Sequence, residues 1–276
     1  MSFGFLFIIS VLAGMVGALS GMGGGVVLVP VLTFLSIDIK QAIAIGNLSA
    51  VAVSTAAASG YVRRHMPSLK ASAFLEVFAV IGALTGALAA VVSQQRLLFL
   101  LYGSTLLVFS GVLWMRRKRE WKPVVRQDAI SRRLGLEGSY YDYAEGRTIA
   151  YKGSRATLAG GLTCVAGMAS GLLGIGGSAL TVLVADSVIG LPPKVSLTTS
   201  NLIVGVMALA GANIYLEAGL INPNLIAPVV LGTTLGALIG SKLLVRLPNP
   251  VLRVGFLTVF ILLGIEMLFH GLRWAS

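Results

Sequence analysis

Charged residues and cysteines are scarce in this chain. Only 11% of its 276 residues are charged, while 56% are hydrophobic, and a soluble domain typically has about 25% charged residues. This composition excludes a soluble globular protein and indicates a polytopic membrane protein. The one cysteine, Cys164, lies in an apolar segment, which excludes a disulfide framework and predicts a buried, unreactive thiol.

Motifs of catalytic and cofactor sites are also missing. The sequence has no HExxH, no cluster of paired cysteines, no nucleophile elbow and no glycine-rich run that ends in the GKS or GKT of a phosphate-binding loop. We therefore expect no enzymatic activity, no metal site and no cofactor. We also do not expect this chain alone to pump with ATP.

Positive charge exceeds negative charge, but the excess is local. The net charge is +11, and eleven of the 21 Lys and Arg residues lie between Arg116 and Arg155. A basic cluster beside apolar segments marks a cytoplasmic loop of a membrane protein rather than a nucleic-acid-binding surface. We expect no nucleic-acid partner, a multi-pass location in the cell (plasma) membrane and a cytoplasmic linker.

The apolar residues form runs that are long enough to span a bilayer. The first and fifth runs exceed one span, and glycines break each of them near its middle, so each could turn back as a helical hairpin. The runs are 3–35, 41–62, 71–93, 97–115, 155–187, 195–216, 224–245 and 250–271.

The two halves of the chain repeat each other. A shift of 153 positions superposes Gly14–Pro30 on Gly167–Leu183. We predict an all-α polytopic membrane protein with two homologous halves, each a glycine-broken helical hairpin plus three transmembrane helices. The first repeat is 1–115, the basic linker is 116–154 and the second repeat is 155–276. Matches at a shift of 154 include Lys40 with Lys194, Asn47 with Asn201, Leu48 with Leu202 and Tyr61 with Tyr215.

Three basic loops indicate how the repeats face the membrane, since Lys and Arg favour the cytoplasmic side. If each of the eight runs crosses the membrane once, the repeats are parallel and the loop around Lys242–Arg253 faces outside. With two hairpins each half makes an odd number of crossings, the repeats are inverted and all three loops face the cytoplasm. We favour the inverted arrangement, which puts both termini outside.

The linker has tyrosine-rich runs on both sides of a turn. Ser139–Tyr143 and Arg147–Tyr151 flank Gly146, a pattern that predicts a small β-hairpin. Such a hairpin could bind a regulatory partner, or it could be a structured cap between the halves. We favour the cap.

The two glycine breaks are the best candidates for a solute-binding site. Several glycines within five residues disfavour a continuous helix, and broken backbone at membrane depth is tolerated only inside protein or beside a wet cavity. The half-helix after each break offers N–H donors and a positive dipole end to an anion. The alternative is that the glycines only allow close helix packing.

Asn47 and Asn201 occupy equivalent positions in the segments after the breaks. We expect both to point inward, where their amide N–H groups suit an oxyanion, and the alternative is a hydrogen bond between helices. Tyr61 and Tyr215 end matching segments and suggest an aromatic belt at the interface. The predicted substrate-binding residues are Ser20, Gly21, Gly23, Gly24, Gly25, Asn47, Gly174, Gly176, Gly177, Ser178, Thr199 and Asn201.

Acidic residues in the apolar runs could couple transport to protons. Glu76 lies near the start of the third run, and Glu266 shares a helix face with His270 four residues later. A carboxylate–imidazole pair can carry a proton, but at the membrane interface the same residues would be ordinary. Since no Lys or Arg lies deep in a run, anion binding is expected to depend on N–H dipoles and neutral side chains.

The paired glycine motifs resemble those of the TauE/SafE family of sulfite and organosulfonate exporters. The motifs are Ser20–Gly25 with Pro30, and Gly171–Gly177, and the spacing from each to the following Lys and Asn also fits. Leu173 and Ser178 depart from the Ser and Gly of the first half. The resemblance covers nearly the whole chain except the linker. It implies secondary transport of small sulfur-containing anions and leaves the solute and the direction open.

We therefore predict a secondary transporter, an exporter by this resemblance, that binds a small anion between the halves and works by alternating access. One alternative is an anion channel, and another is a non-transporting membrane scaffold or sensor that acts through the cytoplasmic linker. A cation transporter with Glu76 and Glu266 as ligands is disfavoured by the shortage of acids in the runs. Glycine-rich faces leave a homo-oligomer open.

Overall fold

The computed structural model describes residues 3–116, 121, 124, 126–142, 146–175, 178–246 and 249–273. Most of these residues are helical, and in chain order a two-stranded antiparallel sheet comes between α6 and α7. The elements are α1 (Phe3–Ser20), α2 (Gly25–Phe34), α3 (Ile39–Val62), α4 (Leu69–Val92), α5 (Gln95–Arg116), α6 (Ala129–Arg133), β1 (Glu137–Asp142), β2 (Arg147–Lys152), α7 (Ala156–Leu173), α8 (Ser178–Val184), the π-helical turn η1 (Ala185–Ile189), α9 (Pro193–Glu217), α10 (Pro223–Arg246) and α11 (Asn249–Arg273).

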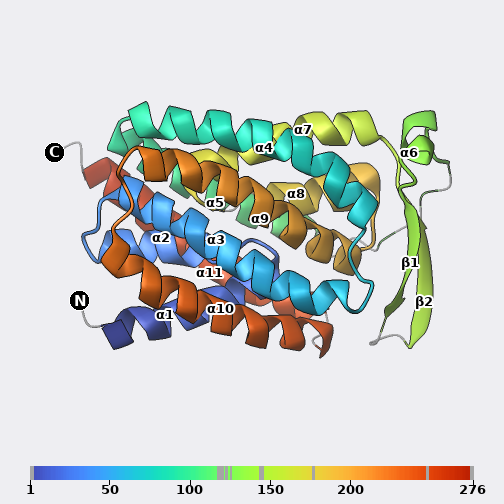
Figure 1. Ribbon diagram of the computed structural model, residues 1–276, viewed down its shortest axis with the longest axis horizontal. Coiled ribbons are helices and arrows are strands. Elements are labelled where there is room, and N and C mark those ends of the chain that lie inside the picture. Colours follow the sequence, from blue (N-terminus) through green and yellow to red (C-terminus); the bar gives the residue numbers. More distant parts are fainter. Residues whose placement is uncertain are drawn as a thin grey trace.

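The long helices run side by side in an elongated bundle (Figure 1). The start of α1 and the end of α11 lie at one end of the bundle, and α6 with the β1–β2 hairpin lies at the other. Among the described residues, six helices are long and apolar enough to cross a membrane, namely α1, α3, α4, α7, α9 and α10.

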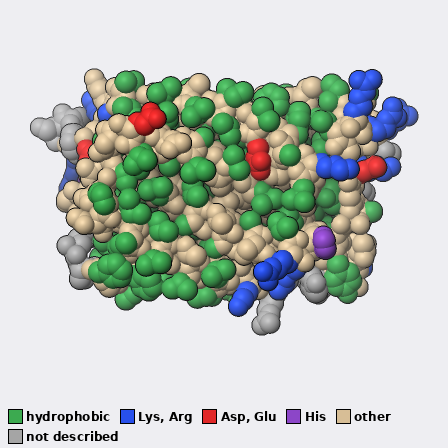
Figure 2. Space-filling model, in the orientation of Figure 1, with side chains coloured by type: hydrophobic (Ala, Val, Ile, Leu, Met, Phe, Trp, Pro, Cys, Tyr) green, Lys and Arg blue, Asp and Glu red, His purple; other side chains and the backbone are tan. Residues whose placement is uncertain are grey.

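The outside of the bundle is apolar. Large hydrophobic side chains such as Ile8, Val77 and Leu209 are exposed on it. Figure 2 shows hydrophobic side chains spread over one face, with Lys and Arg gathered towards the end that carries the linker. A surface of this kind suits lipid, so the chain is a multi-pass membrane protein.

The predicted apolar runs correspond to the helices, and both predicted breaks are present. The first run divides into α1, which ends at Ser20, and α2, which begins at Gly25. The fifth divides into α7, which ends at Leu173, and α8, which begins at Ser178 and continues into η1. The hairpin predicted in the linker is also confirmed, as β1 and β2 pair in antiparallel register.

Helices of one half lie beside helices of the other half, as α10 does beside α3 and α4 beside α9 (Figure 1). We call α1, α2, α3 and α10 the first packing unit, since α10 packs extensively on α1 and α3. We call α4, α7, α8 and α9 the second packing unit, since α4 packs extensively on α7 and α9. The two units meet where α3 packs on α9, and α5 packs on α11 beside them.

Glycines bring the helices of each unit close together. In the first unit, a Cβ added at Gly14 of α1 would overlap the backbone of Thr233 in α10. In the second, a Cβ added at Gly167 of α7 would overlap the backbone of Ala79 in α4. Small residues at such contacts allow the close van der Waals packing that holds helices together in a bilayer.

The linker is docked on the second packing unit. Its Asp142 forms an ion pair of 2.7 Å with Lys194 at the start of α9, and both side chains are less than a tenth exposed. The indole N–H of Trp121 donates to the carbonyl oxygen of Gly190 after η1, at 3.0 Å. Tyr140 and Tyr151 are buried in the same apolar cluster as residues of α4, α7 and α9. The described part of the linker is therefore a structured cap.

Candidate functional site

The first break reverses the chain direction between α1 and α2. Gly21 has a φ of 70°, a conformation that glycine adopts without steric cost. The N–H of Met22 donates to the carbonyl oxygen of Gly17 at 3.1 Å. The Ser20 hydroxyl accepts from the Met22 N–H and donates to the Gly17 carbonyl, both at 3.3 Å. Ser20 thus stabilises the turn itself.

The start of α2 presents backbone donors that are free. Within the described part of the chain, the N–H groups of Gly23, Gly24, Gly25 and Val26 have no acceptor. The first helical bonds come from Val27 and Leu28 to the Gly24 carbonyl. Free N–H groups and the positive end of the helix dipole point the same way, so the start of α2 favours an anion.

The second break has the same backbone turn at its start. Gly174 has a φ of 66°, and its N–H donates to the carbonyl oxygen of Ser170 at 2.8 Å. The predicted site residues Gly176 and Gly177 lie outside the described residues. Ser178 begins α8, and its side chain also lies outside the described part.

The two breaks pack against each other, and each also packs on a central helix of the other half. A Cβ added at Gly25 would overlap the carbonyl oxygen of Gly174. A Cβ added at Gly174 would lie 2.6 Å from the Ile43 carbonyl oxygen in α3. One added at Gly21 would lie 3.2 Å from the Leu197 carbonyl oxygen in α9. The glycines therefore permit backbone contacts at the interface of the two packing units.

Asn47 and Asn201 lie at this interface and are fully buried. The Asn47 amide nitrogen donates to the Ile43 carbonyl oxygen, and the Asn201 amide nitrogen donates to the Leu197 carbonyl oxygen, both at 3.3 Å. These are the two carbonyl groups on which the breaks pack. The amide N–H groups that we expected to bind solute are thus partly engaged. The Oδ1 atoms instead lack a partner among the described residues.

These contacts define a group of residues that we call the central cluster: Gly21, Gly25, Gly174, Asn47 and Asn201. Its two side chains, those of Asn47 and Asn201, are not ionisable. An anion at this point would be held by neutral donors and by the dipole at the start of α2. Of the predicted glycines, the structure thus brings Gly21, Gly25 and Gly174 to this interface, whereas Gly23 packs on Ala50 and Gly24 lies next to Ser49.

Thr199 is not part of the central cluster. It is buried, and its hydroxyl oxygen accepts a hydrogen bond of 2.9 Å from the N–H of Ser68, which precedes α4. Side chains two positions apart on a helix face different directions, so Thr199 points away from Asn201. Its observed role is to join α9 to the start of α4.

Tyr61 and Tyr215 close the ends of the broken helices, so the expected aromatic belt is wrong. Both side chains are completely buried. The Tyr61 hydroxyl donates to the carbonyl oxygen of Ala18 in the last turn of α1 at 3.1 Å, and the Tyr215 hydroxyl donates to that of Gly171 in the last turn of α7 at 2.7 Å. Since α1 and α7 stop inside the bundle, their last carbonyl groups need such donors.

The three candidate proton carriers are on different helices from the central cluster. Glu76 in α4 is half-buried and accepts a hydrogen bond of 2.6 Å from the Ser72 hydroxyl. Glu266 and His270 are half-buried in α11, where the His270 ring lies 5.4 Å from the ring of Phe99 in α5. Proton coupling through these residues stays a prediction.

Sequence reasoning missed several contacts around the site. The Tyr102 hydroxyl of α5 donates to the Gly25 carbonyl oxygen at 3.1 Å and reaches the next carbonyl at 3.4 Å. No repeat signal marks Tyr102, because Phe256 is its match. The partner of Lys194 was also missed, although the repeat marked Lys194 itself. Cys164 is half-buried rather than fully buried as we expected.

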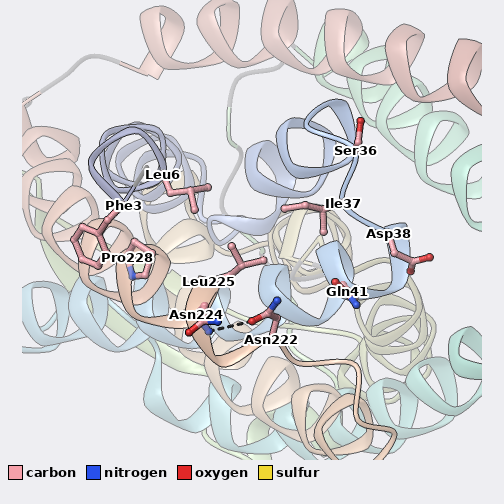
Figure 3. A pocket seen from close by; sticks show the side chains of 10 residues that line it. All are labelled: Phe3, Leu6, Ser36, Ile37, Asp38, Gln41, Asn222, Asn224, Leu225 and Pro228. Carbon is pink, nitrogen blue, oxygen red and sulfur yellow. Dashed lines mark hydrogen bonds between the residues drawn. The ribbon is translucent and has the colours of Figure 1, made fainter. Parts of the chain in front are cut away.

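A surface pocket of about 430 Å³ opens at the end of the bundle opposite the linker (Figure 3). It lies between the start of α1, the α2–α3 connection and the start of α10. Asp38 on its rim already accepts from the N–H of Lys40 at 2.8 Å and from the side chain of Gln95. The pocket shares no residue with the central cluster. Its lining residues are Phe3, Leu6, Ser36, Ile37, Asp38, Gln41, Asn222, Asn224, Leu225 and Pro228.

Comparison with known proteins gives a family and a relative. The profile of the family described as sulfite exporter TauE/SafE matches residues 6–267. The chain is also similar to a protein of Bacillus subtilis (strain 168) described as probable membrane transporter protein YunE. The two are 26% identical over 281 residues, which cover 99% of each chain. No solved structure matches the chain.

Proposed function

The chain belongs to the sulfite exporter TauE/SafE family, and on that premise we propose that it exports small sulfur-containing anions, such as sulfite or sulfonates, across the cell membrane. The family and the relative described as a membrane transporter support transport itself. The solute class follows the family name, and the central cluster is where we place the solute.

One observation carries this assignment. The free N–H groups of Gly23–Val26 stand at the start of α2, where Gly25 packs against the second break and against Gly46, the residue before Asn47. Donors without acceptors inside a membrane protein are costly unless a ligand satisfies them. A sulfonate or sulfite group has several acceptor oxygens and a negative charge, so it complements this helix start. We assign substrate binding to the residues predicted above, apart from Ser20 and Thr199, whose side chains have structural partners.

The proposed architecture is a pair of inverted repeats, 1–115 and 155–276, joined by a cytoplasmic linker, 116–154. The packing of α1 on α10 has a counterpart in that of α7 on α4, as expected if equivalent helices exchange roles between the halves. The start of α1 and the end of α11 share the end opposite the linker (Figure 1), which fits two halves that each cross an odd number of times.

Alternating access then moves the packing units rather than the sequence halves. A rigid rotation of one half against the other would separate α1 from α10 and α4 from α7, which are extensive contacts mediated by glycines. A rotation of the first packing unit against the second keeps both contacts and changes the interface between the units, where α3 packs on α9 and the two breaks touch. The central cluster lies at that interface, so the same movement would expose it to either side.

Two matched disulfides test which parts move. Ser54 and Gly205 connect α3 to α9, with 3.0 Å between the Ser54 Cβ and a Cβ built on Gly205. Ala18 and Gly240 connect α1 to α10, with 3.2 Å between the corresponding atoms. Both pairs are within a few tenths of an ångström of the Cβ separation of about 3.5–4.5 Å in disulfides. In a Cys164→Ser background, oxidation of the first cysteine pair should stop transport, and oxidation of the second should not.

Ligand-dependent thermal stability tests the solute class. The purified protein is heated with sulfite, sulfate, thiosulfate, sulfoacetate, taurine or aromatic sulfonates, since a ligand at 100 times its dissociation constant stabilises the native state by about 2.7 kcal/mol. We expect a selective shift that Asn47→Ala and Asn201→Ala weaken. A flat panel would contradict the proposal, as would unchanged transport affinity in both folded variants. Saturable transport against a gradient in proteoliposomes would separate a transporter from a channel.

A further inference from the structure

The buried asparagines carry acceptor atoms for which the described residues supply no donor. Asn47 Oδ1 and Asn201 Oδ1 are buried and have no hydrogen-bond partner in the described part of the chain. A buried polar atom without a partner is unfavourable. The two unpaired Oδ1 atoms therefore need an explanation. Because they occupy equivalent positions in the two halves, chance does not explain them well.

The described helical backbone beside Asn47 does not supply this donor. A Cβ added at Gly211 in α9 would lie 3.6 Å from Asn47 Oδ1 and 3.5 Å from the Cα of Gly171 in α7. Both glycines are inside helices, where N–H groups are bonded to the preceding turn. Asn47 Oδ1 therefore faces N–H groups that already have acceptors. The Asn201 amide group faces Gly21 at the first break, with its nitrogen 3.6 Å from a Cβ built there.

The central cluster consequently offers two kinds of partner. The start of α2 provides donors, the free N–H groups of Gly23–Val26. The asparagines provide acceptors, and each amide group keeps a second N–H besides the one that its own helix uses. A bare oxyanion would satisfy the donors only and would face two acceptor oxygens. A solute with a hydrogen of its own would satisfy both sets.

We infer that the solute is a monoanion with a hydrogen-bond donor of its own, such as hydrogensulfite or a hydroxy- or aminoalkanesulfonate. Its oxyanion oxygens accept from the start of α2, and its O–H or N–H group donates to Asn47 Oδ1 or Asn201 Oδ1. Fully deprotonated sulfite and sulfate lack that hydrogen and are rejected. This inference rests on the proposed function and narrows the solute class.

A matched pair of ligands tests this inference on the unmodified protein. Ethanesulfonate and 2-hydroxyethanesulfonate have the same charge and differ by one hydroxyl group. A site built to bond a substrate hydroxyl discriminates strongly against the analogue that lacks it, so the hydroxylated compound should bind about tenfold more tightly or better, as measured by calorimetry. Equal affinities, or tighter binding of ethanesulfonate, would overturn the inference and leave anion transport standing.

Variants then locate the acceptor. In Asn47→Ala or Asn201→Ala, the ratio of the affinity for 2-hydroxyethanesulfonate to that for ethanesulfonate should fall towards one. The affinity for ethanesulfonate itself should change little. Each variant keeps the backbone helical bond to the carbonyl that the amide also contacts, so both are expected to fold. Ser110→Ala is the control, since its buried hydroxyl already donates to the Leu106 carbonyl at 2.9 Å, and it should keep the preference. A preference that survives in both asparagine variants would contradict the assignment.

A solute without a carbon chain needs a second measurement. If neither ethanesulfonate compound binds but inorganic sulfite does, its affinity is measured across the pH range in which hydrogensulfite loses its proton. Affinity per total sulfite should fall as pH rises, in proportion to the protonated fraction. A constant or rising affinity would overturn the inference. If no sulfur anion of any kind binds, the proposed function itself fails.

Discussion

The contact between the two breaks can be tested by one methyl group, in Gly25→Ala. Gly25 is the first residue of α2 and lacks a positive φ, so alanine fits the backbone there. Its Cβ would nevertheless overlap the carbonyl oxygen of Gly174 and would lie 3.1 Å from that of Gly46. Both obstacles are backbone atoms, which cannot rotate away. The added methyl group must therefore push the two packing units apart.

The expected cost follows from opposing contributions. Overpacking a tightly packed site costs about 1–3 kcal/mol, and two backbone obstacles put Gly25→Ala near the upper limit. Replacing a helical glycine by alanine gains up to about 1 kcal/mol, and less in the first turn. The net loss is about 2 kcal/mol, which corresponds to a Tm lower by about 4–8 °C. Transport should fall as well, because the interface that opens and closes is distorted.

Gly161→Ala is the matched control for this variant. Gly161 is exposed in α7, and a Cβ added there would meet nothing within 4 Å. This variant should gain about 0.5–1 kcal/mol from the helix preference of alanine and keep full transport. Thermal unfolding in detergent and flux in proteoliposomes measure both properties. If Gly25→Ala were as stable and as active as Gly161→Ala, the two breaks would not be in contact and the proposed site would lose its basis.

Two further predictions concern contacts that support the site. Tyr61→Phe and Tyr215→Phe each remove the donor to a carbonyl group in the last turn of a broken helix. Each should therefore cost about 1–3 kcal/mol in thermal unfolding, and a cost near zero would argue against this capping role. Asp142→Leu or Lys194→Met breaks a buried ion pair and should cost about 3–5 kcal/mol. The double variant Asp142→Leu/Lys194→Met should recover part of that loss. Limited proteolysis of the linker measures the effect, and additive losses in the double variant would contradict direct pairing.

The helices and their breaks could be predicted because they depend on local sequence. The third apolar run, 71–93, corresponds to α4 at Leu69–Val92 because a helix in lipid needs about 20 apolar residues. The breaks could be located because clustered glycines disfavour helix wherever they occur. The linker hairpin was equally local, since its tyrosine-rich runs flank a turn. These features depend on no contact between distant parts of the chain.

The packing of each break on the opposite half could not be predicted. Sequence identified Gly21 and Asn201 as candidates, but nothing local shows that they touch. The same limit explains the error at Tyr61. A tyrosine at the end of an apolar run usually lies at the membrane surface, but α1 stops inside the bundle and supplies a buried acceptor. The orientation of the two asparagine amides could not be predicted either. It depends on which amide atom finds a hydrogen-bond partner in the folded protein.

The proposed repeat also explains why the protein has one central cluster rather than two. If the halves are related by a twofold axis, a contact between unlike helices must occur twice, as α1–α10 and α7–α4 do. A contact between equivalent helices occurs once and lies on the axis, and the α3–α9 and α5–α11 contacts are of this kind. Asn47 and Asn201 are equivalent residues of α3 and α9, and they lie on opposite sides of that axis. Asn47 Oδ1 faces Gly211 of α9, while the Asn201 carbonyl oxygen accepts from Ser54 of α3. The two breaks touch each other at Gly25 and Gly174, so a solute bound there would meet both breaks at once.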